Sequence, residues 1–221
     1  MVGALGSAVM EQAFGLSIPR TLDDVCNPRD MALLVYDMQV GIVRQIADGP
    51  AIVARNREVL AVFRAARVRT FFTRHMSLPP ELMGAAQYRT AMAWQHLDRP
   101  DGVQPWFLRG SPSFELSPEL APLPSEAIFD KITMSALEGT PLAIALRDCG
   151  VRALAISGVA LEVGIEPTAR HAADLGIIPI IIADACGSGH AEAGRRSLES
   201  LKFAGDAIIT DLASVRRLLE R

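Results

Sequence analysis

The chain has 221 residues, of which 50% are hydrophobic, and carries a formal net charge of −3 with a sequence pI of about 5.8. This length suits one α/β domain with a large core, and the hydrophobic share argues against a disordered chain. Because the sequence shows neither a basic tract interleaved with aromatic residues nor an apolar run of transmembrane length, we expect no nucleic-acid binding and no membrane insertion.

The cysteines and the amino-terminal residues indicate the cellular compartment. Cys26, Cys149 and Cys186 follow no metal-binding spacing and are too few for a disulfide framework. The first residues lack the positively charged leader of a secretory signal. Both features favour a reduced, cytoplasmic protein.

Residues 1–30 are predicted to be an N-terminal extension, with Thr21 as the N-cap of a short helical turn, and residues 31–221 to form one domain. Within that domain, apolar stretches predict six strands, at residues 31–36, 68–73, 127–129, 153–156, 178–183 and 207–209. Amphipathic patterns predict helices between them, at residues 51–66, 140–149, from 163 onward, 191–203 and 212–219. This alternation predicts a mostly parallel six-stranded sheet with helices on both faces, an α/β fold.

Residues 76–125 interrupt the alternation. This segment is rich in proline, contains both tryptophans, and has a helical pattern around residues 82–94. We expect it to run over the sheet edge and to help cover a pocket. Segments of this kind, and the N-terminal extension, often complete the surface of a neighbouring subunit, so we expect a homo-oligomer, a dimer or tetramer.

The stretch from residue 153 to residue 170 is the most informative part of the chain. An apolar run leads into Ser157 and Gly158, and a helical pattern begins after Glu162. A strand followed closely by a helix N-terminus is a common place for ligand binding in α/β proteins, because free N–H groups and the helix dipole point toward the ligand. Glu166 and Gly164 also lie near this helix start.

Several polar or small residues follow the predicted strands: Asp37, Gln39, His75, Lys131, Glu162, Gly164 and Asp184. Ligands of parallel sheets bind beyond the carboxyl ends of the strands, where these residues meet. A partly buried carboxylate at Asp37 is costly unless a cation such as Lys131 offsets the charge, and such a pair suits proton transfer. The alternatives are structural: Asp37 as a helix cap, Lys131 as a surface residue and Gly164 as a close-packing glycine.

Four segments together resemble the isochorismatase-like hydrolase superfamily: LLVYDMQ (33–39), FDKITMSALEGTPL (129–142), SGVALEVGIEPTARHAADLG (157–176) and IIIADAC (180–186). The resemblance implies a three-layer α/β/α sandwich and a cis peptide bond within residues 158–160. Amidase members of that family use an Asp–Lys–Cys triad. Asp37 and Lys131 match the first two members of the triad.

The chain departs from the family pattern at the nucleophile, where Gly164 stands in place of the cysteine and Leu161 in place of a threonine. A thiol mechanism cannot run from a glycine. True isochorismatases, which hydrolyse a vinyl ether, also resemble this arrangement, with an acid and a lysine but no thiol. The residues expected there, Tyr-Ala-His, are absent: the flanks are Ala160, Leu161 and Glu162.

The sequence therefore predicts catalytic roles for Asp37, Lys131 and Gly164. Gly164 is expected to leave room for substrate or water and to offer its N–H, together with that of Ala160, to developing negative charge. The predicted substrate-binding residues are Gln39, His75, Val159, Ala160 and Glu162. No cofactor is expected. A metal is not expected either, because the Asp-x-His pattern that some relatives carry near the second strand is missing from TRHMSLP.

The function predicted from the residues and the resemblance is hydrolysis of a small anionic or carbonyl-containing metabolite by Asp/Lys acid–base chemistry, with either a vinyl-ether or a C–N bond cleaved. Two alternatives stay open. The protein is a non-catalytic binding or scaffold relative, or it is a C–N amidohydrolase with another nucleophile, such as Cys186 on the neighbouring strand.

Overall fold

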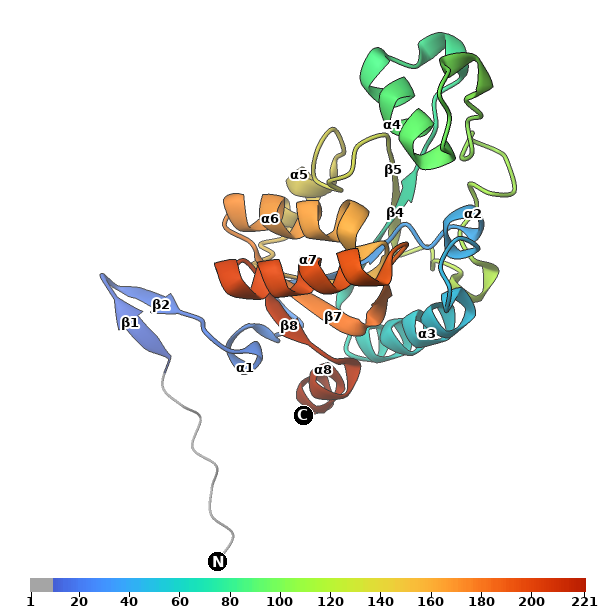
Figure 1. The fold of residues 1–221 in the computed structure, drawn as a ribbon. Helices are drawn as coiled ribbons and strands as arrows, with labels where there is room; N and C mark the ends of the chain where they lie inside the picture. Colours follow the sequence, from blue (N-terminus) through green and yellow to red (C-terminus); the bar gives the residue numbers. More distant parts are fainter. Residues whose placement is uncertain (1–9) are drawn as a thin grey trace, which may run out of the picture.

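The computed structural model of the protein describes residues 10–221 (Figure 1). Its centre is a six-stranded sheet of order β5-β4-β3-β6-β7-β8, in which every neighbouring pair is parallel. The strands are β3 (Met31–Tyr36), β4 (Arg69–His75), β5 (Ala127–Lys131), β6 (Ala153–Val159), β7 (Ile178–Gly187) and β8 (Ile208–Thr210). The predicted α/β class and the number of strands are confirmed.

Helices cover both faces of this sheet. One face carries α3 (Gly49–Ala65) and α8 (Leu212–Leu219), and the other carries α5 (Leu142–Asp148), α6 (Glu166–Asp174) and α7 (Ala191–Ala204) (Figure 1). A short helix, α2 (Val40–Val43), follows β3. The result is the three-layer sandwich expected from the alternation of strands and helices.

Strand β3 lies between β4 and β6 and contributes side chains to the core on both faces of the sheet. Met31, Leu33 and Val35 pack among the residues of α3 and α8. Leu34 and Tyr36 point to the opposite face, toward α5 and α6. A strand buried on both faces needs apolar residues at every position, which explains why the sequence shows an unbroken apolar run here.

The strand ends differ from the prediction in two places. Strand β6 does not stop at residue 156 but continues to Val159, after a shift of register toward β7 that lies between Ile156 and Gly158. Gly158 has a φ of +120° and lies against the backbone of Tyr36, so a side chain there would be both strained and overlapping. Apolar periodicity cannot reveal such a bulge.

Strand β7 likewise continues to Gly187, three residues beyond Asp184. Asp184 therefore lies inside the strand and not after it. Its carboxylate accepts a hydrogen bond from the N–H of Leu212 at 2.9 Å, at the start of α8. The prediction that Asp184 stands at the ligand-binding edge is wrong, because it satisfies a helix N-terminus instead.

The segment after β6 is also more elaborate than a simple helix start. Leu161–Ile165 forms a π-helical turn before α6 begins. Single π-helical turns are rare and frequently occur at functional sites. Similarly, the helix predicted over residues 140–149 begins at Leu142, and the Thr140 hydroxyl accepts a hydrogen bond from its N–H at 3.2 Å.

Residues 10–30 form a hairpin of β1 (Glu11–Ala13) and β2 (Leu16–Ile18), followed by α1 (Leu22–Val25). Thr21 caps α1 as predicted, in a capping box with Asp24. The hairpin projects from the body of the molecule (Figure 1). Within residues 10–221, no helix is both long and apolar enough to cross a membrane.

The excursion, residues 76–125, stands over the ends of β4 and β5 (Figure 1). It holds one α-helix and three 3₁₀ turns: α4 (Ala85–Gln95), η1 (Pro80–Leu82), η2 (Pro100–Gly102) and η3 (Pro118–Leu120). The expected helix is present, although it begins at Ala85. An isolated β-bridge from Gln39 to Leu116 fastens the excursion to the carboxyl edge of the sheet, and another, from Ser77 to Leu108, joins two parts of the excursion itself.

Candidate functional site

Asp37 and Lys131 form a buried ion pair at the carboxyl edge of the sheet. Asp37 directly follows β3, Lys131 is the last residue of β5, and Thr73 lies on β4 between them. The Lys131 Nζ atom lies 2.6 Å from Asp37 Oδ2, and the Thr73 hydroxyl donates to Asp37 Oδ1 at 2.7 Å. Asp37 is 4% exposed and Lys131 is 3% exposed. Both carboxylate oxygens therefore have a donor within the protein, as a buried charge requires.

The parallel register explains how two strands that are not neighbours supply one ion pair. Lys131 is aligned with His75 on β4, two residues beyond Thr73. Its long side chain passes across the end of β4 to reach Asp37. The lysine Nζ also donates to the Thr133 carbonyl at 3.1 Å and lies 4.4 Å from the centroid of the Tyr36 ring. These contacts hold the ammonium in a single place.

Burial lowers the pKa of Lys131, and the charge of Asp37 together with its hydrogen bond opposes that shift. A lysine in this position depends on the carboxylate for its charge. The two residues therefore act as one electrostatic unit and not as independent groups.

The backbone of Asp37 is unusual. Its φ is +46°, in the left-handed region that residues other than glycine rarely adopt. Its N–H donates to the Thr73 hydroxyl at 3.3 Å, and its carbonyl accepts from the N–H of Gln39 at 2.7 Å. Backbone conformations of this kind persist where surrounding contacts enforce them, and they cluster at functional sites.

A cavity of about 410 Å³ opens beside this pair. Asp37, His75, Val159 and Ala160 line it from the strand ends, so four of the predicted site residues share one cavity. The Val159–Ala160 peptide bond is cis, in the segment where the resemblance implies one. The other walls come from α2, from the turns around β7 and α7, and from the excursion, and they include Trp94, Trp106, Phe107 and His190.

Gly164 does not provide the open space expected of it. A Cβ atom at this position would overlap the phenol of Tyr36, whose hydroxyl donates to the carbonyl of Met134. The N–H of Gly164 is also occupied, because it donates to the Ala160 carbonyl at 3.1 Å within the π-helical turn. The missing side chain is therefore replaced by an aromatic ring from β3, and the predicted N–H contact to substrate is wrong.

Tyr36 itself is 2% exposed and contributes to the cavity wall. Burial, and next the negative charge of Asp37, raise the pKa of its hydroxyl well above the usual value. A phenol held protonated in this way is a hydrogen-bond donor and not a nucleophile.

Gln39 and Glu162 support the cavity from behind. Gln39 is fully buried, and its amide bonds only to backbone: Nε2 donates to the carbonyls of His75 and Phe114 at 3.0 and 2.9 Å, and Oε1 accepts from the His75 N–H at 2.6 Å. Glu162 accepts from the N–H of His190 at 2.7 Å. Neither residue lines the cavity, so their predicted contact with substrate is replaced by a positioning role.

His75 links the ion pair to the excursion. Its ring lies edge-on to Trp94 and to Phe107, at centroid distances of 6.3 and 6.0 Å. Burial, followed by the charge of Lys131, lowers the pKa of His75 to about 4. At neutral pH the imidazole is therefore uncharged.

The three cysteines lie outside the cavity lining. Cys186 is buried, and its thiol lies 3.8 Å from the Ile156 carbonyl. Burial raises the pKa of this thiol well above its usual value. Burial likewise raises the pKa of Cys26 to about 11. Thiols of this kind are structural, because the reactive form of cysteine is the thiolate. Among residues 10–221, no three histidine, cysteine or acidic side chains gather as metal ligands do.

Comparison with known proteins places this geometry in a family. A family model described as the isochorismatase domain matches residues 31–214. The chain therefore belongs to the isochorismatase family, and it is an isochorismatase-family hydrolase at this general level.

Two relatives illustrate the range of the family. The uncharacterized isochorismatase family protein YecD of Escherichia coli O157:H7 is 29% identical over 183 residues, which is 79% of this chain and 89% of that protein. The ureidoacrylate amidohydrolase RutB of Pseudomonas savastanoi pv. phaseolicola is 28% identical over 174 residues, which is 72% of this chain and 71% of that protein.

Solved structures agree on the fold. A cysteine hydrolase from Pseudomonas syringae pv. phaseolicola 1448A superposes with a TM-score of 0.74 at 24% identity, covering 88% of this chain and 94% of that chain. An isochorismatase family protein from Burkholderia thailandensis superposes with a TM-score of 0.71 at 25% identity, covering 88% of this chain and 97% of that chain.

Sequence reasoning did not single out Tyr36 and Thr73. Tyr36 directly precedes Asp37, and a polar-tipped ring at the end of an otherwise aliphatic run is a signal that it faces the site. Thr73 ends the predicted second strand, next to the position where a carboxylate partner is needed. Thr73 could have been found from the need of Asp37 for a second hydrogen-bond donor.

The fit between Tyr36 and Gly164 predicts coupled stabilities. Gly164→Ala should destabilise the protein, because the added methyl overlaps the phenol ring. In the Tyr36→Leu background, Gly164→Ala should lower the free energy of unfolding by less than it does in the wild type. The difference, which is the coupling free energy, should be at least about 1 kcal/mol. Chemical denaturation of the four proteins measures this. Gly84, where a Cβ meets open space, is the matched control, and Gly84→Ala should add independently to Tyr36→Leu. Additivity at Gly164 would contradict the packing described.

The pKa of His75 predicts a pH dependence of stability. The native value of about 4 lies below the unfolded value of about 6.5, so below pH 6.5 the unfolded chain takes up a proton that the native protein does not. Its stabilising contribution is complete above pH 6.5 and declines toward pH 4, by at most about 1.4 kcal/mol per pH unit. His75→Gln should make the denaturation midpoint depend less steeply on pH between pH 6.5 and pH 4. The same substitution at exposed His96 should leave the wild-type dependence in place, and identical slopes for wild type and His75→Gln would refute the shift.

Proposed function

We propose that the protein hydrolyses a small carbonyl-containing metabolite by acid–base chemistry at Asp37 and Lys131, without a cysteine nucleophile. The observation that carries this proposal is the buried ion pair itself. Its Nζ–Oδ2 distance is 2.6 Å, and its carboxylate lines a cavity of ligand size whose lining contains no thiol. A buried carboxylate–lysine pair is costly to maintain, so its place on a cavity wall favours use in proton transfer.

The hydrogen bonds around Asp37 favour the role of a base in the first step. Lys131 and Thr73 both donate to it, and a carboxylate is the form that accepts from both. Its remaining lone pairs can receive a proton from water. As the water oxygen adds to the substrate carbonyl carbon, its proton passes to Asp37. Asp37 then returns the proton to the leaving atom, the carbon–heteroatom bond breaks, and the site regains its charge.

Lys131 would support both steps. Its ammonium donates to Asp37 at 2.6 Å and holds the carboxylate in place, and from behind the cavity lining its positive charge stabilises the negative charge that develops on the carbonyl oxygen. The neutral hydroxyl of Tyr36, beside Lys131, fills the space from which a side chain at position 164 would otherwise act. The arrangement thus favours direct attack by water.

Cleavage of a C–N bond is the favoured reaction. Base catalysis suits attack on an amide or ureido carbonyl, whereas hydrolysis of a vinyl ether begins with proton donation. The similarity to the ureidoacrylate amidohydrolases RutB supports the same choice. Vinyl-ether hydrolysis is the second candidate, and the glycine at position 164 favours it through the resemblance to true isochorismatases.

The central variant is Asp37→Asn. It should lower the turnover of any substrate found in a panel of amides, ureas and vinyl ethers by about two to four powers of ten, because the base is lost. Asp130→Asn is the matched control, since Asp130 precedes Lys131 but pairs outward with Arg74 and Arg109. It should retain activity. Circular dichroism must show that both variants are folded.

Activity that survives Asp37→Asn would overturn the proposed chemistry. If no compound in the panel is turned over and Asp37→Asn binds each of them as the wild type does, the non-catalytic alternative becomes the better account. If Cys186→Ala abolishes turnover, the thiol alternative is correct.

A further inference from the structure

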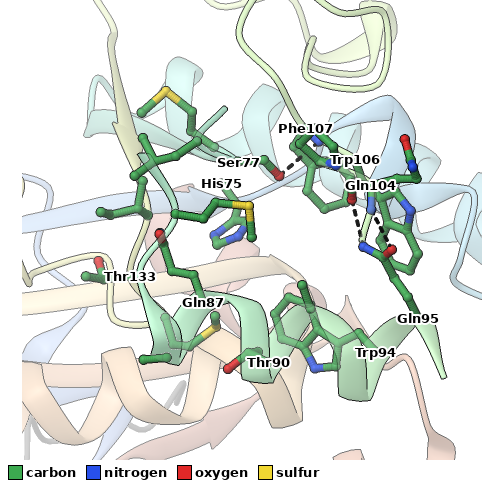
Figure 2. Close-up of a pocket in the computed structure, with 18 residues that line it drawn as sticks. His75, Ser77, Gln87, Thr90, Trp94, Gln95, Gln104, Trp106, Phe107 and Thr133 are labelled. Atoms are coloured by element: carbon green, nitrogen blue, oxygen red, sulfur yellow. Dashed lines mark hydrogen bonds between the residues drawn. The ribbon is translucent and has the colours of Figure 1, made fainter. Parts of the chain in front are cut away.

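A second cavity of about 300 Å³ lies under α4, next to the one that contains Asp37 (Figure 2). Helix α4 forms one wall, the end of β4 forms the floor, and residues 104–107 form the opposite wall. Figure 2 shows His75 at the centre, with Trp94 on one side and Phe107 and Trp106 on the other. We call this second space the annex.

The annex is lined without a charged side chain at neutral pH. Its apolar surface includes three methionines and three aromatic residues: Met76, Met83, Met134, Trp94, Trp106 and Phe107. Its histidine, His75, is neutral because burial lowers its pKa to about 4. Methionine and aromatic side chains offer a surface that adapts to apolar groups of different shape.

Several polar groups of the annex are already satisfied by the protein. Gln95 exchanges two hydrogen bonds with the backbone of Gln104, at 2.7 and 2.9 Å. Ser77 accepts from the N–H of Phe107 at 3.1 Å (Figure 2), and Gln87 accepts from the N–H of Gly84 at 3.2 Å. These bonds hold the walls in place. The polar side chains that remain, such as the hydroxyl of Thr90 and the amide of Gln104, are uncharged.

The annex adjoins the cavity that contains Asp37. Five residues line both spaces: His75, Trp94, Trp106, Phe107 and Met134. Because the two spaces share these walls, the annex is the neighbouring space for the far end of a molecule bound at Asp37. Because an ion moved into such a site would lose its hydration without gaining a partner, a charged group would be rejected there.

We propose that the annex is a specificity subsite for the uncharged, apolar or aromatic tail of the substrate, whose carbonyl head lies at Asp37. The substrate class is then neutral amides or ureas with an apolar substituent, and compounds with an anionic tail are excluded. This inference rests on the proposed function for the position of the head. It changes the expectation from sequence, in which an anionic metabolite was one of two options.

Binding of simple amides, measured on rapid mixing before product accumulates, tests the proposal separately from turnover. The probes are butanamide, hexanamide and octanamide, which share one neutral head, and the monoamide of octanedioic acid, which adds a carboxylate at the far end. Both tryptophans of the chain line the annex, so intrinsic fluorescence reports binding directly. Affinity should rise about fourfold for each added methylene, and the terminal carboxylate should weaken binding at least about tenfold relative to octanamide.

Two matched variants locate the tail. Ala91 lines the annex on α4, whereas Ala85 on the same helix is exposed and lines neither cavity. Ala91→Phe should fill the annex and bind octanamide no better than butanamide, whereas Ala85→Phe should keep the wild-type series. Circular dichroism compares their folding.

A flat affinity series in the wild type, equal binding of the charged probe, or an unchanged series in Ala91→Phe would each overturn the proposal. These outcomes are independent of the Asp37→Asn activity test. If that test fails, the reaction chemistry is wrong, while the chain-length series still reports whether the annex takes an apolar tail.

Discussion

The ion pair between Asp37 and Lys131 is the interaction on which the site depends. Two charges buried at 4% and 3% exposure are tolerated only because each is held by the other, with Thr73 also donating to Asp37 and the Thr133 carbonyl also accepting from Lys131. That condition requires three strands, β3, β4 and β5, to end at the same level. The parallel sheet supplies this alignment, and the φ of +46° at Asp37 turns the carboxylate toward β5 and the cavity instead of into a helix cap.

A second constraint is the mutual fit of Tyr36 and Gly164. The aromatic ring from β3 occupies the volume that a side chain at the start of the π-helical turn would need. The ring also lies against the Lys131 ammonium. The Tyr36 ring therefore fills the space left by the absent side chain at Gly164. A nucleophile at residue 164 is therefore incompatible with this core, and water is the remaining attacking group in the account proposed here.

The sequence predicted the fold well because strands buried on both faces are unbroken apolar runs, such as residues 31–36 and 178–183. It also brought Asp37, His75 and Lys131 to one edge, since parallel strands place their ends together. It did not reveal the bulge at Gly158 or the true end of β7, because register depends on neighbouring strands. It misplaced Gln39, whose amide serves only backbone groups, since side-chain direction after a strand is set by tertiary contacts such as those with the excursion.

We propose that hydrolysis proceeds by direct attack of water, with no covalent enzyme intermediate. Intact-protein mass spectrometry tests it on enzyme quenched during turnover of the most rapidly hydrolysed amide or urea. A single species with the mass of the unmodified chain is expected at every time point. An adduct with the mass of an acyl or carbamoyl group that appears and decays during turnover, and that is lost in Cys186→Ala, would contradict it.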